Sequence, residues 1–351
     1  MACIRLLDQA RKNSFLFYFK LRPAMLTPLL LAKRALLLAV LLLASPGLRA
    51  QGLQAAPSPP ISLPMPTASP TRLHADVAFL TSIKPARQYR NLASLNKAAD
   101  YIHAEFKKLG GPVTEQKFQV EGHEYRNIIA SFGPPDAERL VVGAHYDVCG
   151  EQPGADDNAS AVAGLLETAR LLQPQAASLK RRIDFVAYSL EEPPFFATEH
   201  MGSAVHAASL HAEKARVRAM LCYEMIGYFS DAPGSQRFPD AALAAHYPST
   251  GNFIIVVGKQ GQETLTQQVQ TLMRAHSTID VQRINLPASQ ALAGLSDHRN
   301  YWHHGYEALM INDTSFLRNP NYHQASDTID TLDFQRMAQV VNGVFGALLA
   351  L

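Results

Sequence analysis

The sequence predicts an α/β fold, a three-layer sandwich in which a mostly parallel central sheet carries helices on both faces. Three observations predict this fold: strand-like and helix-like segments alternate along the chain, one strand is apolar on both faces, and polar residues gather where strands end. The chain has 351 residues, of which 47% are hydrophobic and 18% are charged. This composition is that of a globular protein with enough residues to bury a large core.

Hydrophobic periodicity defines the alternating segments. Apolar residues recur at helical spacing over 95–109, and this helix is expected to stop at Gly110-Gly111. The segment 183–190 is apolar on both faces apart from Asp184, as a central parallel strand must be when helices cover both sides of its sheet. Further strands are expected at 113–120, 125–132, 140–144, 220–225 and 253–257. Further helices are expected at 158–172, 203–211, 263–275 and 334–349.

The N-terminal segment has the pattern of a leader. Residues 35–44 form an uncharged apolar run that follows Lys33-Arg34, which is typical of a secretory signal peptide. The run is shorter than the roughly 20 residues that span a bilayer, so we expect cleavage near Ala50 and no stable membrane insertion afterwards. The protein is then exported, to the periplasm or to the medium. An uncleaved anchor and a start of translation at Met25 are the alternatives.

The domain organisation follows from this leader. Residues 1–50 are expected to be the signal peptide, residues 51–72 a proline-rich linker, and residues 73–351 the folded domain. The signal peptide carries eight basic residues and one acidic residue, whereas residues 51–351 carry 24 basic and 29 acidic residues. A net charge of −5 on the exported part argues against a nucleic-acid partner.

The folded domain contains two cysteines, Cys149 and Cys222. In an oxidising compartment these two thiols could pair, but the sequence does not give their separation. The chain has no Cys-x-x-Cys pattern, and its absence argues against zinc binding by thiolates.

Polar residues that can bind a metal follow the predicted strands. His145 ends one strand, and the carboxylate of Asp147 can hold the second nitrogen of its ring. Asp157 precedes a predicted helix, where plain helix capping by Asp157 or Asn158 is the simpler explanation. In a doubly wound sheet, however, ligands bind outside the carboxyl ends of the strands, so these residues are site candidates.

Three further positions add acids and a second imidazole. Glu191 and Glu192 follow a buried strand directly, where one carboxylate can bind metal while its neighbour holds an attacking water. Glu224 lies among apolar residues, and a buried carboxylate must meet a cation, a donor or a proton. His323 lies in a polar loop before the last helix. Carboxylates and neutral imidazoles without thiolates suit zinc or a similar divalent ion.

In this order and at these spacings the residues resemble the exported zinc aminopeptidases of peptidase clan MH, the bacterial leucyl-aminopeptidase type of family M28. The resemblance covers about Asn91 to Leu351. The motifs that carry it are His145-Tyr146-Asp147, Gly154 to Ser160, Glu191-Glu192, Glu-Met-Ile-Gly-Tyr from Glu224, Ser296-Asp297-His298, and Tyr322-His323.

The resemblance implies a pair of zinc ions. Asp157 would bridge the two ions, His145 and Glu224 would complete one site, and Glu192 and His323 would complete the other. Two ions lower the pKa of a shared water and stabilise the charge of the transition state. The substrate would be a peptide, and its free amine would bind at the metal pair, which restricts cleavage to the N-terminal peptide bond.

The resemblance also assigns the remaining roles. Glu191 would be the general base that takes the proton of the water and passes it to the leaving amine. Asp147 would support His145, and Asp297 would either support the site or cap the helix that starts at His298. A cis peptide is expected between Asp157 and Asn158.

Two departures from the family pattern bear on this assignment. Many relatives have aspartate where this chain has Glu224, so the site formed with His145 is the less certain of the two. Several relatives carry a tyrosine just before the Ser-Asp-His motif, whereas residues 291–295 contain none. What stabilises the oxyanion beyond the metals is therefore open.

Two alternative functions share the fold. A glutaminyl cyclase would keep a single zinc on Asp157, Glu192 and His323, but it would be expected to lack His145. A non-catalytic binding domain would be expected to have lost ligands that are present here. The segments 228–252 and 285–297 are expected to build the substrate pocket.

Overall fold

The structure is a computed structural model that describes residues 65–351. The expected signal peptide and residues 51–64 of the expected linker lie outside the described residues. Residues 66–351 form one compact unit. None of the helices in the described range has the length and apolar character needed to cross a membrane.

An eight-stranded mixed sheet forms the centre of the fold, with the strand order β1-β2-β4-β3-β5-β8-β6-β7. The strands are β1 (Val113–Val120), β2 (His123–Phe132), β3 (Arg139–His145), β4 (Arg182–Tyr188), β5 (Val217–Glu224), β6 (Phe253–Lys259), β7 (Asp280–Leu286) and β8 (Ala308–Asn312). Within the described chain, four of the seven neighbouring pairs are parallel and three are antiparallel. The expected mostly parallel sheet is confirmed.

The parallel block of the sheet positions the candidate site. β4, β3, β5 and β8 are neighbours and run parallel to one another, so their carboxyl ends meet at one edge of the sheet. The residues at or just after three of these ends are His145, the pair Glu191-Glu192, and Glu224. The antiparallel hairpin of β1 and β2 extends the sheet beyond β4, and β6 pairs antiparallel with β8 on the other side.

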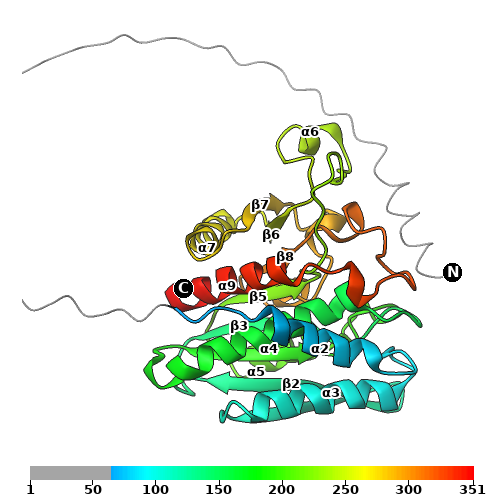
Figure 1. Cartoon of the computed structure of the whole chain (residues 1–351). Coiled ribbons are helices and arrows are strands. Elements are labelled where there is room, and N and C mark those ends of the chain that lie inside the picture. The colour runs from blue at the N-terminus through cyan, green and yellow to red at the C-terminus, as the bar shows by residue number, and fades with distance from the viewer. Residues whose placement is uncertain (1–64) are drawn as a thin grey trace, which may run out of the picture. The chain divides into compact units, whose positions relative to one another are not determined.

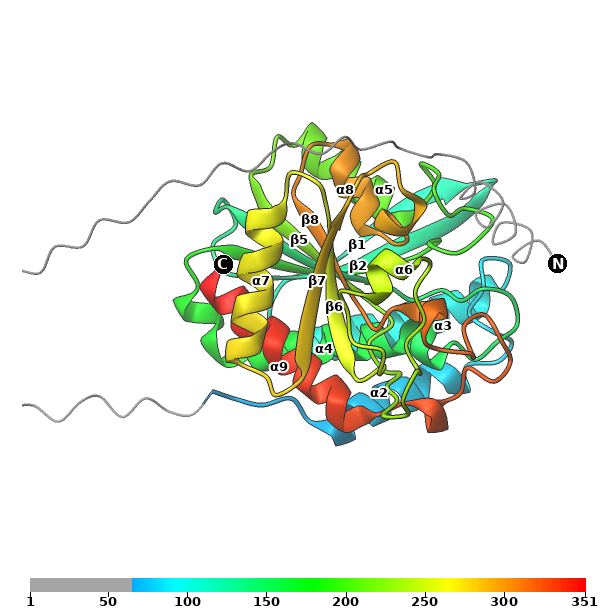
Figure 2. The ribbon, with the colours of Figure 1, turned by 90° about the horizontal axis from the view of Figure 1, so that it is seen from above.

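Helices cover both faces of the sheet, which makes the three layers that the sequence predicts (Figures 1 and 2). One face packs against α2 (Pro70–Ser82), α3 (Leu92–Lys107), α4 (Ala161–Leu172), α7 (Glu263–Ala275) and α9 (Phe334–Ala350). The other face packs against α5 (Gly202–Ala212) and α8 (His298–His303). A short helix, α6 (Ala241–Ala244), belongs to an extension above the sheet in Figure 1.

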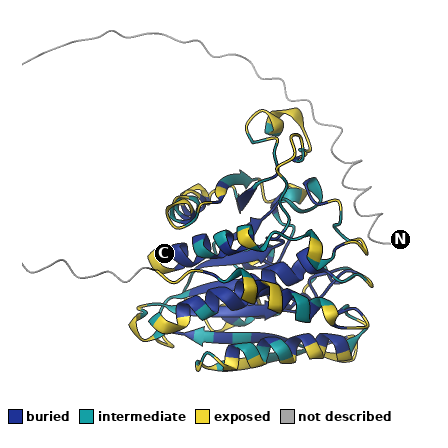
Figure 3. Ribbon diagram, in the orientation of Figure 1, coloured by how far each residue is buried: buried dark blue, intermediate teal, exposed yellow. Residues whose placement is uncertain are grey.

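Side-chain alternation along the strands divides the core between the two faces. In β3, Leu140 and Val142 pack into the larger hydrophobic cluster, whereas Val141 packs into the cluster beneath α5 and α8. Successive side chains of a strand point to opposite faces, and here both faces are apolar because both are covered. The central strands are accordingly buried along most of their length (Figure 3).

The structure differs from the sequence-based expectation in several places. The strands β7 and β8 and the helices α2 and α6 were not expected. The first helix begins at Pro70, so residues 70–72 belong to the folded domain and not to the linker. Arg72 anchors this start, since its guanidinium binds the buried carboxylate of Glu167 with Nε 2.8 Å from Oε2. The helix expected over 158–172 begins at Ala161, after an irregular segment over Ala155–Ser160.

Candidate metal centre

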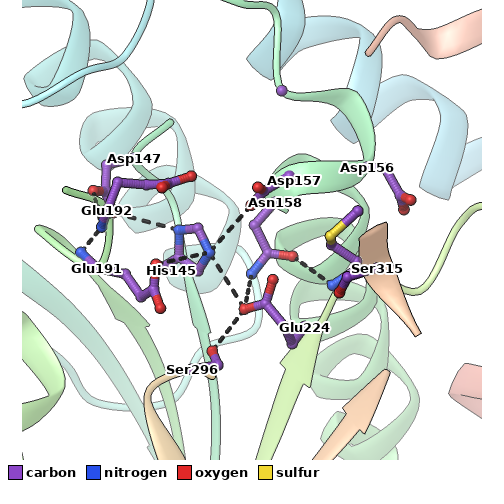
Figure 4. Close-up of polar contacts among 12 residues, drawn as sticks. His145, Asp147, Asp156, Asp157, Asn158, Glu191, Glu192, Glu224, Ser296 and Ser315 are labelled. Carbon is purple, nitrogen blue, oxygen red and sulfur yellow. Dashed lines mark hydrogen bonds and ion pairs between the residues drawn. The ribbon is translucent and has the colours of Figure 1, made fainter. Parts of the chain in front are cut away.

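His145 lies at the centre of a cluster of carboxylates at the edge of the sheet (Figure 4). Its Nε2 atom is 3.5 Å from Asp157 Oδ1, 3.4 Å from Glu224 Oε2 and 3.8 Å from Glu191 Oε2. The ring is buried, and burial lowers the pKa of the imidazole. The carboxylates of Glu191 and Glu224 outweigh that effect, so the pKa stands well above its ordinary value.

Asp157 faces two imidazoles with its two oxygens. Oδ1 lies 3.5 Å from His145 Nε2, and Oδ2 lies 3.0 Å from His323 Nε2. Burial raises the pKa of this carboxyl, but the two imidazoles outweigh burial and hold the pKa below its ordinary value. His323 Nε2 is also 3.3 Å from Glu192 Oε2. Asp157 therefore joins one group of donors around His145 to a second group around His323.

The loop that carries Asp157 is fixed by backbone contacts. The carboxylate of Asp327 accepts hydrogen bonds from the backbone N–H groups of Asp156, at 2.9 Å, and Asp157, at 3.1 Å. Gly154 has φ of 60°, and a Cβ there would lie 2.4 Å from the carbonyl oxygen of Asp157. The peptide between Asp157 and Asn158 is cis, as the resemblance implies.

Asp147 positions both glutamates that follow β4. Its Oδ1 accepts a hydrogen bond from the backbone N–H of Glu191 at 3.1 Å, and its Oδ2 accepts one from Glu192 at 3.0 Å. Oδ1 also lies 3.4 Å from His145 Nδ1, the contact that the sequence predicts. One buried carboxylate therefore ties the end of β3 to the turn after β4.

Glu191 and Glu192 are both buried, and their pKa values are raised. Burial raises the pKa of the Glu191 carboxyl well above its ordinary value; His145 opposes this rise, and the nearby Glu224 adds to it. Burial likewise raises the pKa of Glu192 to about 7, with a further rise from Asp157 that His323 opposes. Carboxyl groups with raised pKa values can exchange protons near neutral pH, which general acid–base chemistry requires.

Glu224 is held in place by neighbouring side chains. Its Oε2 accepts a hydrogen bond from Ser296 Oγ at 2.6 Å and lies 3.4 Å from Asn158 Nδ2. Burial raises the pKa of Glu224, and His145 opposes that rise. Asp297, next to Ser296, is fully buried and makes no side-chain capping bond to α8. Burial raises its pKa to about 7, and His145, Glu224 and Asp147 are close enough to shift it as well.

These residues fit divalent metal ions. Two sets of residues each bring three donor atoms within 4.8 Å of one another. One set is His145, Glu191 and Glu224, and the other is Cys149, Glu192 and His323. Among the described residues, Oε1 of Glu192 is a buried oxygen without a hydrogen-bond partner, and a cation would satisfy it. The second set contains Cys149, so a thiol lies among the candidate donors although the chain has no Cys-x-x-Cys pattern.

Comparison with known proteins places these residues in a family. The sequence model of peptidase family M28 matches residues 127–347, a range that contains every candidate ligand. The chain belongs to peptidase family M28. YfbL of Escherichia coli K12, described as an uncharacterised protein, is 44% identical over 289 residues, which are 80% of this chain and 88% of the relative. The probable leucine aminopeptidase 1 of Trichophyton verrucosum is 25% identical over 318 residues, covering 80% of this chain and 78% of the relative.

Solved structures share the M28 fold. The zinc aminopeptidase BSAP from Bacillus subtilis superposes with a TM-score of 0.66 at 15% identity, over 82% of this chain and 96% of that chain. The glutaminyl cyclase of Bacteroides thetaiotaomicron superposes with a TM-score of 0.61 at 20% identity, over 81% of this chain and 98% of that chain. At these identities the likeness establishes the fold and not the reaction.

An apolar pocket adjoins the candidate metal centre. Glu224 forms part of its wall, and both segments expected from the sequence contribute to it. Phe238, Leu243 and Tyr247 come from 228–252, and Leu286, Leu292 and Leu295 come from β7 and the segment that follows it. The pocket is therefore a place for an apolar side chain beside the carboxylates.

Sequence reasoning missed several residues that hold this site. Ser296 on Glu224 and Asp327 on the Asp157 loop act across 72 and 170 positions of the chain. Arg87 is buried and donates to the carbonyls of Tyr146, at 3.0 Å, and Gly154, at 2.9 Å, so it clamps the two loops that carry ligands. Only the motif Ser296-Asp297-His298 gave a signal, and it did not indicate which atom Ser296 would contact.

Proposed function

We propose that this protein is an exported aminopeptidase that hydrolyses the N-terminal peptide bond of peptides with two zinc ions. His145 and Glu224 would hold one ion, Glu192 and His323 the other, and Asp157 both. The observation that carries the proposal is the pair of short contacts from the two oxygens of Asp157 to two different imidazoles. A carboxylate with one oxygen directed to each half of a donor cluster suits a bridge between two cations.

Each residue has a defined task in this proposal. When bound, the zinc pair supplies an acidified water and positive charge that stabilises the transition state. Glu191 takes the proton of the attacking water and delivers it to the leaving amine, for which its buried position and raised pKa are suited. Asp147 fixes the backbone of Glu191 and keeps the carboxylate directed at the cluster. The cluster is acidic as a whole, which favours binding of the positively charged amino terminus of a peptide.

The pocket beside Glu224 supports a preference for apolar N-terminal residues. Its walls are mainly leucine, isoleucine and aromatic side chains, with few polar groups. Burying an apolar side chain there contributes roughly 1.5–3 kcal/mol. We therefore expect leucyl or phenylalanyl peptides to be better substrates than alanyl or acidic ones.

A glutaminyl cyclase is the second candidate, because a cyclase shares the fold over most of both chains. His145 and Glu224 argue against it. Each is buried at the carboxyl end of its own central strand, and His145 Nε2 lies 3.4 Å from Glu224 Oε2. Two donors this close are what a second metal site requires. A peptide with an N-terminal glutamine separates the candidates, since a cyclase would release ammonia from it and an aminopeptidase would release free glutamine.

Metal removal tests the proposal. Dialysis of the purified protein against a chelator should abolish hydrolysis of a leucyl anilide, and zinc should restore it. Asp157→Ala should lose both ions together, because one carboxylate serves both. An Asp157→Ala protein that keeps two ions would contradict the bridge.

Export is a separate part of the proposal and rests on the apolar run at 35–44. N-terminal sequencing of the protein recovered from the periplasm or medium should give a start near position 51. A protein that stays in the cytoplasm with an intact N-terminus would refute it.

A further inference from the structure

Cys149 lies against the metal centre. Its thiol, a carboxylate oxygen of Glu192 and a ring nitrogen of His323 all lie within 4.8 Å of one another. The residue is 6% exposed. A sulfur, an oxygen and a nitrogen donor thus lie near one another, and two of them belong to the residues proposed to hold the second zinc ion.

The backbone around Cys149 is held firmly. The N–H of Val148 donates to the carbonyl of Arg87 at 3.2 Å, and the guanidinium of Arg87 donates to the carbonyl of Tyr146 at 3.0 Å. Asp147 is bound to the backbone of Glu191 and Glu192. The segment that carries the thiol is therefore fixed relative to the turn that carries Glu192.

The surroundings of Cys149 are not those of a cysteine that only fills space. A buried cysteine without a chemical role usually behaves as a small apolar side chain. Cys222 packs in the cluster that contains Val141 and Met220, its Sγ lies 3.4 Å from Ser296 Oγ, and among the described residues it belongs to neither set of candidate metal donors. Cys149 instead adjoins an imidazole and a carboxylate, and Oε1 of this carboxylate is buried without a hydrogen-bond partner among the described residues.

We propose that the Cys149 thiolate is an additional ligand of the ion that Glu192 and His323 hold. This inference rests on the proposed zinc centre and extends its set of ligands. The bond forms between Sγ and the metal, and the thiol proton passes to solvent, as metal binding by cysteine requires. Ligands around one zinc ion, with zinc–sulfur near 2.3 Å and zinc–nitrogen near 2.0–2.1 Å, lie roughly 3.5 Å apart. The three donors, which lie within 4.8 Å of one another, would close in by about 1 Å at most to reach this spacing.

A sulfur ligand would make the two metal positions unequal. The position at His145 would have only nitrogen and oxygen donors, whereas the position at His323 would also have sulfur. Soft thiolates favour zinc, and carboxylates alone suit magnesium or manganese equally well. The ion at His323 would therefore be held more tightly and would be the more selective for zinc.

Spectroscopy of the metal-loaded full chain tests the inference. Cobalt-substituted wild-type protein should show a near-ultraviolet thiolate-to-cobalt charge-transfer band. Cys149→Ser should lose this band, while the matched control Cys222→Ser should keep it. X-ray absorption of the zinc-loaded wild type should contain a sulfur shell at about 2.3 Å, and this measurement needs no variant.

Metal retention gives an independent readout. In competition with a chelator, Cys149→Ser should lose one of its two ions at least about tenfold more readily than wild type. Tenfold is the lower end of the fall in metal affinity seen when a residue that only supports a metal ligand is removed. Far-ultraviolet circular dichroism shows whether each variant is folded. A wild type with two ions, no charge-transfer band and only nitrogen and oxygen neighbours would overturn the role of Cys149 and leave the aminopeptidase proposal intact. A folded wild type that binds no metal would overturn both.

Discussion

Replacing Glu191 by glutamine separates proton transfer from metal binding. Glutamine has the same number of heavy atoms as glutamate, so it fills the same buried space. The backbone N–H of residue 191 still donates to Asp147, which keeps the turn in place. The five ligands are untouched, so the variant should keep two zinc ions and fold normally.

The expected loss of turnover follows from the burial of the Glu191 carboxyl. Its side chain is 7% exposed, so solvent replaces it poorly as a proton acceptor. Removal of a general base costs about 10²–10⁴ in turnover, and we expect the upper end. A loss of about 10⁴ corresponds to roughly 5.5 kcal/mol of barrier at about 1.4 kcal/mol per tenfold.

The assay is hydrolysis of a leucyl anilide, with zinc content measured on the same sample. Glu199→Gln is the matched control, because Glu199 lies in the same connection between β4 and α5 but is exposed. The control should retain wild-type turnover. Glu191→Gln with near-normal turnover would show that Glu191 is not the base. Loss of one zinc equivalent would show that Glu191, which lies 3.8 Å from His145, is a ligand.

Three further outcomes follow from the same structure. Asp147→Asn replaces one acceptor oxygen by an N–H group facing backbone donors, so metal affinity should fall about 10–100-fold in chelator competition; unchanged affinity would contradict its positioning role. Leu295→Phe fills the apolar pocket and should lower kcat/KM for a leucyl anilide at least about tenfold more than for an alanyl one, and an equal loss for both would place the pocket elsewhere. Burial raises the pKa of Asp297 to about 7 and that of Asp327 to about 8, so near neutral pH the folded state binds more protons at these carboxyls than the unfolded state does. The thermal midpoint of the metal-free protein should therefore be lower at about pH 8.5 than at about pH 6.5. A higher midpoint at about pH 8.5 would contradict the raised pKa values of these two carboxyls.

The sequence predicted the parts of the site that depend on local pattern. His145, Glu191, Glu192 and Glu224 each follow an apolar segment, and such segments become neighbouring strands whose carboxyl ends share one edge. The order of ligands and their spacing then identified the family. The segments 228–252 and 285–297, which the sequence predicted to build the substrate pocket, both line the apolar cavity beside Glu224.

The sequence did not predict contacts between distant segments. Asp147 was expected to touch only His145, because a spacing of two residues gives no sign that Glu191 and Glu192 would donate their backbone N–H groups to it. The contact of Ser296 with Glu224 depends on β8 and α8 lying beside β5, and β8 was not expected. The sequence argued against Cys149 as a zinc ligand because the chain has no Cys-x-x-Cys pattern. Whether Cys149 lies near Glu192 and His323 depends on how distant segments fold together, which this pattern does not show.

The most direct test of the zinc centre is the number of metal ions per chain in active protein, measured by elemental analysis. The arrangement of two imidazoles on the two oxygens of Asp157 predicts two zinc ions. Full activity with a single ion, or with none, would contradict the bridged pair.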